Sequence, residues 1–171
     1  MSGTVTARVI VRDAGEADLP AILGIYNHAV LNETSIWNDD IADLADRRAW
    51  WQARVSRGFP VYVADVDGVV AGYGTFADFR PHQGYRFTVE HSIYVAAYAQ
   101  RRGIGSVLLT RLIAEARRMN MHAMVGGIAA ENTASIALHL RFGFAETARM
   151  PQVGFKFGRW LDLVLMQKLL A

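Results

Sequence analysis

Gln100-Arg101-Arg102-Gly103-Ile104-Gly105 is the stretch that decides the fold of this chain. Before it, residues 91–95 have the composition of a strand, and from Ile104 onward apolar side chains recur at helical spacing. A glycine-rich turn that opens a helix directs several free backbone N–H groups, and the positive end of the helix dipole, at one place. Two arginines add side-chain donors, so the turn is suited to holding a phosphate.

Two common phosphate-binding patterns do not fit this turn. A dinucleotide-binding turn reads Gly-x-Gly-x-x-Gly near the start of a fold, whereas this turn lies past mid-chain and lacks the third glycine. A nucleoside-triphosphate loop reads Gly-x-x-x-x-Gly-Lys-Ser/Thr, which the sequence does not contain. Taken alone, the turn also fits an ordinary strand–helix connection in which glycine serves only the backbone shape.

The composition narrows the class of protein. The chain has 171 residues, which suits one domain with a sizeable core. Its net charge of +2 is too small to indicate nucleic-acid binding, and the absence of cysteine excludes disulfides, thiolate metal sites and a cysteine nucleophile. The sequence has no apolar run long enough for a membrane span and no signal-peptide pattern at its start. We therefore expect a cytoplasmic protein without a nucleic-acid or membrane partner.

Hydrophobic periodicity and turn residues predict alternating strands and helices along the whole chain, as a single domain over residues 1–171. The predicted helices cover residues 19–30, 44–55, a stretch beginning at 104, and 132–142, with a capping box over 13–16 before the first. The predicted strands cover residues 7–12, 60–66, 69–79, 87–95 and 122–129, with two more between 146 and 170, the last over 160–166.

A second motif lies downstream of the glycine turn. Asn132 is placed to cap a short helix, Ser135 follows one turn later, and His139 lies one further turn along the same side. Gly143-Phe144 then closes the segment. Read by themselves, Asn132 is equally consistent with a plain helix cap and His139 with a half-buried helix residue.

Together, the two motifs resemble the GNAT superfamily of N-acetyltransferases. The resemblance implies an α/β (α+β) fold with a mixed, mostly antiparallel sheet of about seven strands and helices on both faces, an order that the predicted elements match. It implies acetyl-CoA as the cosubstrate and no metal. The residues that it assigns to acetyl-CoA are Ile93, Tyr94, Val95, Gln100, Arg101, Arg102, Gly103, Ile104, Gly105, Ser106, Asn132 and Ser135. In this assignment the backbone of 93–95 pairs with the pantetheine arm, the turn holds the pyrophosphate, and His139 lies near the thioester sulfur.

The resemblance narrows to the phosphinothricin and methionine sulfone/sulfoximine acetyltransferase group. It is carried by Thr88-Val89-Glu90-His91-Ser92-Ile93-Tyr94-Val95 and by Lys156-Phe157-Gly158-Arg159-Trp160-Leu161-Asp162. Arg101 departs from the group, whose members usually have glycine there. This likeness implies N-acetylation of a small amino acid or analogue, a role in detoxification and a homodimer.

The chemistry requires a base, because only the free amine attacks and an α-amino group titrates near 8. We assign Glu90 as the base. The alternative is a non-catalytic role, in which Glu90 is a solvated strand carboxylate or a partner for Arg86. His139 is the candidate acid, or the member of a pair with Glu90, and Tyr94 is an alternative donor. The resemblance implies that the backbone supplies the oxyanion N–H near Val95.

The acceptor is expected to contact a small group of polar residues. Arg80 leads it, because a guanidinium at a strand end can hold a carboxylate, phosphinate or sulfone oxygen through two hydrogen bonds. The other substrate-binding candidates are Pro81, His82, Glu90, His91 and Ser92, with Tyr26, Glu33, Trp37 and Phe79 as weaker candidates for the pocket wall. We expect Lys156 to reach the site of a neighbouring subunit.

Three alternatives remain open at this point. A GNAT enzyme could use another amine, such as a protein N-terminus or a polyamine, although Arg80 and Arg86 argue against a polyamine site. A non-catalytic acyl-CoA sensor on the same fold is the second, because fold does not fix function. A nucleic-acid module is the third, and the dispersed arginines argue against it.

Overall fold

The structure is a computed structural model that describes residues 8–170. One sheet runs through it in the order β1-β2-β3-β4-β5-β7-β6, and every neighbouring pair is antiparallel except β4 and β5. The strands are β1 (Val9–Asp13), β2 (Val61–Val66), β3 (Val69–Asp78), β4 (Thr88–Val95), β5 (Ala123–Ala129), β6 (Ala145–Lys156) and β7 (Arg159–Leu169). The mixed, mostly antiparallel sheet is confirmed; the predicted start of the first strand at Ala7 lies outside the described residues.

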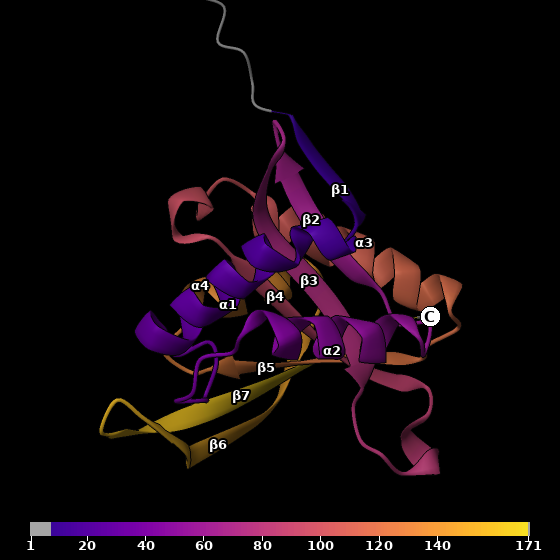
Figure 1. Cartoon of the computed structure of the whole chain (residues 1–171). Helices are drawn as coiled ribbons and strands as arrows, with labels where there is room; N and C mark the ends of the chain where they lie inside the picture. Colours follow the sequence, from indigo (N-terminus) through magenta and orange to yellow (C-terminus); the bar gives the residue numbers. More distant parts are fainter. Residues whose placement is uncertain (1–7, 171) are drawn as a thin grey trace, which may run out of the picture.

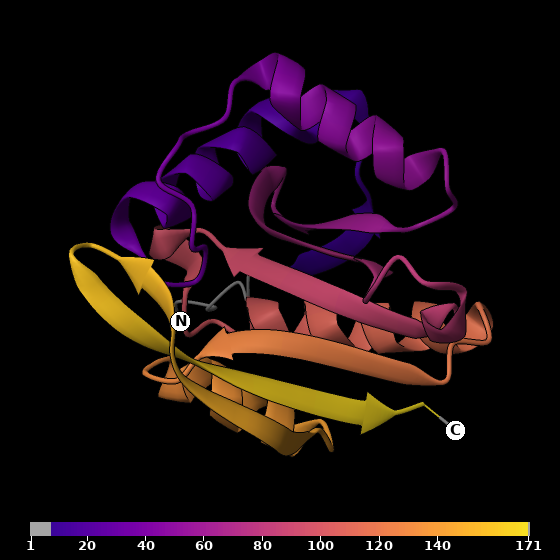
Figure 2. The ribbon, with the colours of Figure 1, turned by 90° about the horizontal axis from the view of Figure 1, so that it is seen from below.

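Helices cover both faces of the sheet. Figures 1 and 2 show α1 (Leu19–Asn32) and α2 (Leu44–Val55) on one face and α3 (Ile104–Arg118) and α4 (Thr133–Arg141) on the other. Short 3-10 turns cover Glu16–Asp18, Gln83–Tyr85 and Ala97–Ala99. The apolar stripes of the helices and the apolar residues of the central strands form one buried core. Among the described helices, none is long and apolar enough to cross a membrane.

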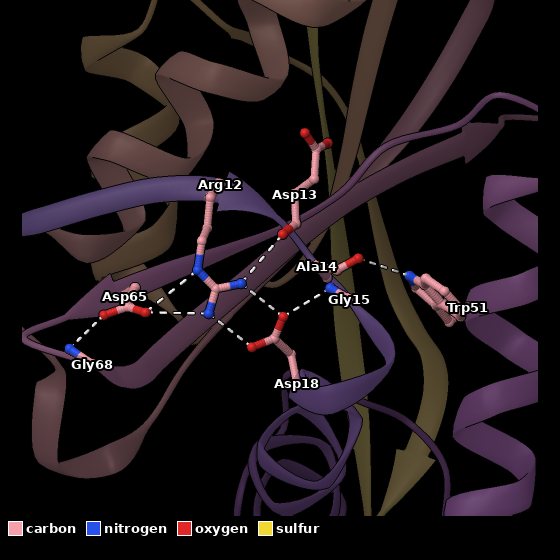
Figure 3. Close-up of polar contacts among 8 residues, drawn as sticks. All are labelled: Arg12, Asp13, Ala14, Gly15, Asp18, Trp51, Asp65 and Gly68. Carbon is pink, nitrogen blue, oxygen red and sulfur yellow. Dashed lines mark hydrogen bonds and ion pairs between the residues drawn. The ribbon is translucent and has the colours of Figure 1, made fainter.

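A polar network fixes the start of α1 against the edge of the sheet (Figure 3). The Arg12 guanidinium donates to both carboxylate oxygens of Asp18, at 2.8 and 2.9 Å, and also to Asp65. The Asp18 carboxylate in turn accepts the N–H of Gly15 at 2.8 Å. The predicted capping box over residues 13–16 is therefore wrong, because Asp18, held by Arg12, satisfies the free N–H of this turn.

The loop between α1 and α2 is held down by a buried lysine of β6. Lys156 is 1% exposed, and its Nζ donates to the carbonyls of Glu33 at 2.7 Å, Ala29 at 3.4 Å and Ile36. The last carbonyls of a helix lack partners within the helix, so an ammonium group at this place is stabilising. The expectation that Lys156 reaches a neighbouring subunit is wrong, because the side chain is buried within its own chain.

Candidate active site

One edge of β4 loses its strand partner halfway along. β4 pairs with β5 only where 88–90 lies opposite 123–125. Beyond that point β5 continues to pair with β7, whereas residues 91–95 of β4 pair only with β3. The backbone groups of this half that point away from β3 are available to an extended ligand, which can bind as an added strand. The residues assigned to the pantetheine arm, 93–95, lie in this half.

The glycine turn stands directly after this edge. Gly103 is the N-cap of α3 with φ of 81°, and it has no side chain to satisfy the N–H groups of the first turn. Arg101 also adopts a left-handed conformation, with φ of 61°. Arg101 and Arg102 are exposed, and neither forms an ion pair within residues 8–170. The turn therefore offers backbone donors and two guanidinium groups to an anion.

The start of α4 lies on the same face of the sheet as α3. Asn132 is the N-cap, and its Oδ1 accepts the N–H of Ser135 at 3.0 Å, as the spacing predicts. The Ser135 carbonyl in turn accepts a hydrogen bond from Nδ1 of His139 at 2.7 Å. Because a carbonyl can only accept, Nδ1 of His139 carries the proton and Nε2 is left with its lone pair.

That lone pair is used by a second histidine. Nε2 of His139 lies 3.0 Å from Nε2 of His91, so the proton between the two nitrogens belongs to His91. Burial lowers the pKa of both imidazoles, and that of His91, which also faces His139, falls to about 3. Both rings are therefore neutral at pH 7. In this arrangement neither ring has a proton to give to a leaving group.

Glu90 lies on the opposite face of the sheet from the two histidines. Successive side chains of a strand alternate between faces, so Glu90 and Ser92 point one way and His91 the other. Two adjacent positions of β5 confirm this: a Cβ at Gly127 would lie 3.3 Å from Oε1 of Glu90, and one at Gly126 would lie 2.9 Å from Nε2 of His91. The expected pair of Glu90 with His139 is not made. His91 faces away from the acceptor candidates.

Glu90 has the environment of a base. It is half-buried, and burial raises the pKa of its carboxyl, while the positive charge of Arg80 partly opposes this rise. Arg80, Pro81 and His82 are exposed on the loop after β3, with the guanidinium carbon of Arg80 5.0 Å from the ring centre of Phe79. Of the acceptor candidates, the structure brings Arg80 and Ser92 to the same side as Glu90.

Sequence reasoning missed two arginines on this side. Arg47 and Arg54 project from α2 onto Trp50, with guanidinium carbons 5.0 and 4.6 Å from its ring centre. Residues 47, 50 and 54 recur at helical spacing, so the sequence did place them on one face of the helix. That spacing was the available signal, but a cationic helix face is usually exposed to solvent.

Comparison with known proteins places this arrangement in a family. The profile of the "Acetyltransferase (GNAT) family" matches residues 22–144. The chain belongs to the GNAT family of acetyltransferases. The GNAT match spans the end of β4, the glycine turn, α3 and the α4 motif, the elements that build the site above.

Individual GNAT relatives are also similar over nearly the whole chain. An L-methionine sulfoximine/L-methionine sulfone acetyltransferase of Salmonella typhimurium is 55% identical over 92% of this chain and 92% of its own. A phosphinothricin N-acetyltransferase of Alcaligenes faecalis is 39% identical over 92% of this chain and 81% of its own. The structure of a Salmonella typhimurium acetyltransferase with its cofactor acetyl-CoA superposes with a TM-score of 0.93 at 53% identity, covering 95% of this chain and 94% of that one.

Proposed function

We propose that this GNAT protein transfers the acetyl group of acetyl-CoA to the amino group of a small amino acid or analogue, such as methionine sulfone, methionine sulfoximine or a phosphinothricin-like compound. The single observation that carries the proposal is Glu90, a half-buried carboxylate beside the free edge of β4. The activities named for the relatives at 55% and 39% identity support the same substrate class. We propose that residues 1–171 form a single domain and that this domain carries the activity.

The residues present fit acetyl-CoA. The backbone of 93–95 has a free edge for the amide groups of a pantetheine arm, and the turn over 100–106 offers donors to a pyrophosphate. On α4, Asn132 and Ser135 lie at the N-terminal end, where they would contact the same ligand. When bound, acetyl-CoA supplies an activated acyl group.

Glu90 would take the proton that the acceptor ammonium must lose, directly or through a water. The free amine then attacks the thioester carbonyl, and the N–H near Val95 stabilises the negative oxygen of the tetrahedral intermediate. The attack forms the carbon–nitrogen bond; collapse of the intermediate then restores the carbonyl, breaks the carbon–sulfur bond and releases the second proton of the nitrogen to the departing sulfur. Arg80 and Ser92 would hold the acceptor in place on the same face.

The sulfur leaves as a thiolate and takes up the proton that the nitrogen releases, because an ordinary thiol has a pKa of about 8.5 and is mostly protonated at neutral pH. Tyr94 suits the role of a hydrogen-bond donor to it, since burial raises the pKa of its hydroxyl and keeps it protonated. His139 enters the proposal as part of the neutral pair with His91, which packs against Gly126 of β5.

A homodimer, a cytoplasmic location and a role in detoxification complete the proposal. Phe155 and Trp160, at the tip of the β6–β7 hairpin, are 55% and 61% exposed, and their rings lie 5.0 Å apart. Exposed aromatic side chains of this kind suit a protein interface. Acetylation of a toxic amino-acid analogue removes the charge of its amine, which supports the detoxification role.

Release of free CoA thiol from acetyl-CoA tests the proposal. The chain contains no cysteine that would interfere with a thiol reagent. The acceptor panel contains methionine sulfone, methionine sulfoximine, phosphinothricin, ordinary amino acids, a polyamine and a peptide with a free N-terminus. Fast release with the sulfone, sulfoximine or phosphinothricin is expected. Tight binding of acetyl-CoA without release for any acceptor would overturn the proposal in favour of a sensor.

A further inference from the structure

Two guanidinium groups on α2, one buried and one partly buried, have no part in the steps above. Arg47 is only 9% exposed, and Arg54 is partly buried. The Nε atom of each is buried without a hydrogen-bond partner, and neither residue forms an ion pair within residues 8–170. A buried charge that lacks a partner is strongly unfavourable. An anion bound from outside the chain would remove this cost.

Aromatic rings hold the two groups in place. The guanidinium carbon of Arg47 lies 4.0 Å from the ring centre of Tyr26 and 5.0 Å from that of Trp50. The guanidinium carbon of Arg54 lies 4.6 Å from the same Trp50 ring. Stacking of this kind fixes the planes of the two guanidinium groups and displaces water from their faces. It leaves the N–H groups at the edges of both guanidinium groups unpaired.

The cluster lies over the half of β4 that carries the free edge. Trp50 packs edge-on against Tyr73 with ring centres 5.9 Å apart, and Tyr73 lies 5.2 Å from Tyr94. Tyr94 and Glu90 belong to the same strand and, four residues apart, point to the same face. The two arginines are therefore on the side of the sheet where the amine must lose its proton.

The two charges reinforce each other as an anion site. Burial, and then the like charge of Arg47, lower the pKa of Arg54. Two guanidinium forks with unpaired N–H groups match the two oxygens of a carboxylate. An α-amino acid carries such a carboxylate on the carbon atom that bears its reacting amine.

We propose that Arg47 and Arg54 bind the α-carboxylate of the amino acid acceptor, an inference that rests on the proposed function. Arg80, at the exposed end of the same face, is then left for the oxygen atoms of the acceptor side chain. A peptide N-terminus and a polyamine have no carboxylate beside the amine, so the two arginines select free amino acids against both.

Binding of methionine sulfone and of its carboxamide, which lacks only the negative charge, tests this inference. Titration calorimetry of the full chain with free CoA present gives both dissociation constants without turnover. Arg47→Gln and Arg54→Gln are each expected to weaken binding of methionine sulfone by about 30-fold and binding of its carboxamide by less than about threefold. Arg48→Gln is the matched control, because Arg48 is exposed on the same helix and pairs with Glu16 at 2.7 Å; it should change neither.

An unchanged ratio of the two constants in Arg47→Gln and Arg54→Gln would overturn the inference, as would equal binding of acid and carboxamide by the wild-type protein. If the glutamine variants do not fold, Arg47→Lys decides: it keeps the charge but loses the planar fork, and we expect at least about fivefold weaker binding of the sulfone alone. Equal sulfone binding by Arg47→Lys and wild type counts against the inference. Failure of the proposed function shows separately, as the absence of CoA release by the wild-type protein.

Discussion

Nε2 of His91 lies 3.0 Å from Nε2 of His139, and the two imidazole rings are within 9° of parallel. One face of the pair is closed by Phe144, whose ring stands edge-on to both. The carbonyl of Ser135 fixes the proton on Nδ1 of His139, so one proton bridges the two rings. Two histidines of separate elements, β4 and α4, are thereby joined in a defined protonation state.

The stability of the fold should decrease on acidification, because the histidines of the unfolded chain take up protons that this buried pair does not. The folded-state pKa of each imidazole is below the unfolded value of about 6.5, so the stabilisation is complete above that pH and is lost as the pH falls through the folded-state pKa, which for His91 is about 3. Each added proton contributes a slope of up to about 1.4 kcal/mol per pH unit. Urea unfolding between pH 6.5 and 4.5 measures it. His91→Phe should give a shallower slope, and parallel curves for the two proteins would contradict the assignment.

Glu90→Gln should lower kcat by about 10²- to 10⁴-fold, since general base catalysis contributes factors of this size. The KM for acetyl-CoA should change little, because the cosubstrate contacts lie elsewhere. Burial raises the pKa of Glu90, so wild-type activity should already fall on acidification above the ordinary carboxylate range, and the variant should lack this acid limb. Steady-state kinetics from pH 5 to 9 would show both. Glu146→Gln, at an exposed ion pair with Arg149, should behave like the wild type.

Arg101→Gly should make the chain more stable and bind acetyl-CoA less tightly. At φ of 61° an arginine is in a conformation that costs about 1–2 kcal/mol, a cost that glycine avoids. Loss of the guanidinium should also weaken pyrophosphate binding. Thermal unfolding and acetyl-CoA titration measure the two effects separately. Arg102 has no positive φ, so Arg102→Gly should bind acetyl-CoA less tightly without becoming more stable. If Arg102→Gly is also stabilised, the gain at Arg101 does not come from backbone strain.

Lys156→Met should destabilise the fold by about 3 kcal/mol, because the variant leaves buried carbonyls at the end of α1 without their donor. The loop between α1 and α2 should loosen with it, which would raise the KM of the acceptor more than it lowers kcat. Urea unfolding and kinetics test the two parts. Lys168→Met, on β7, serves as the control. Equal effects of the two substitutions would contradict the role given to the hydrogen bonds of Lys156.

Local signals predicted one helix to the residue and most other elements to within one or two residues. The bounds of α2 agree with the predicted 44–55, where Asp43 accepts the N–H of Asp46 and Asp46 accepts that of Asp43. Asn132 caps α4 as its spacing predicted. These features depend on contacts within a few residues, which a sequence shows directly.

The contacts of the site depend on which face each element covers, and this the sequence did not show. Strand alternation alone places Glu90 and His91 on opposite faces, but only the packing of α4 brings His139 to the side of His91. The same holds for Lys156, which we expected to reach the site of a neighbouring subunit and which the fold buries against the end of α1. The roles assigned to Glu90, Arg80 and the acetyl-CoA contacts stay predictions until kinetics test them.

The unpaired edge of β4 has a consequence for how the stability of the protein depends on the concentration of acetyl-CoA. If acetyl-CoA takes the place of the missing neighbouring strand, the amides of residues 91–95 that point away from β3 exchange with solvent slowly only while the ligand is bound. A ligand that binds only the folded chain shifts unfolding by mass action, and at about 100 times its Kd the shift is about 2.7 kcal/mol. The lifetime of the protein against proteolysis would then follow the acetyl-CoA concentration, so that a starved cell retains less of it than a well-fed one.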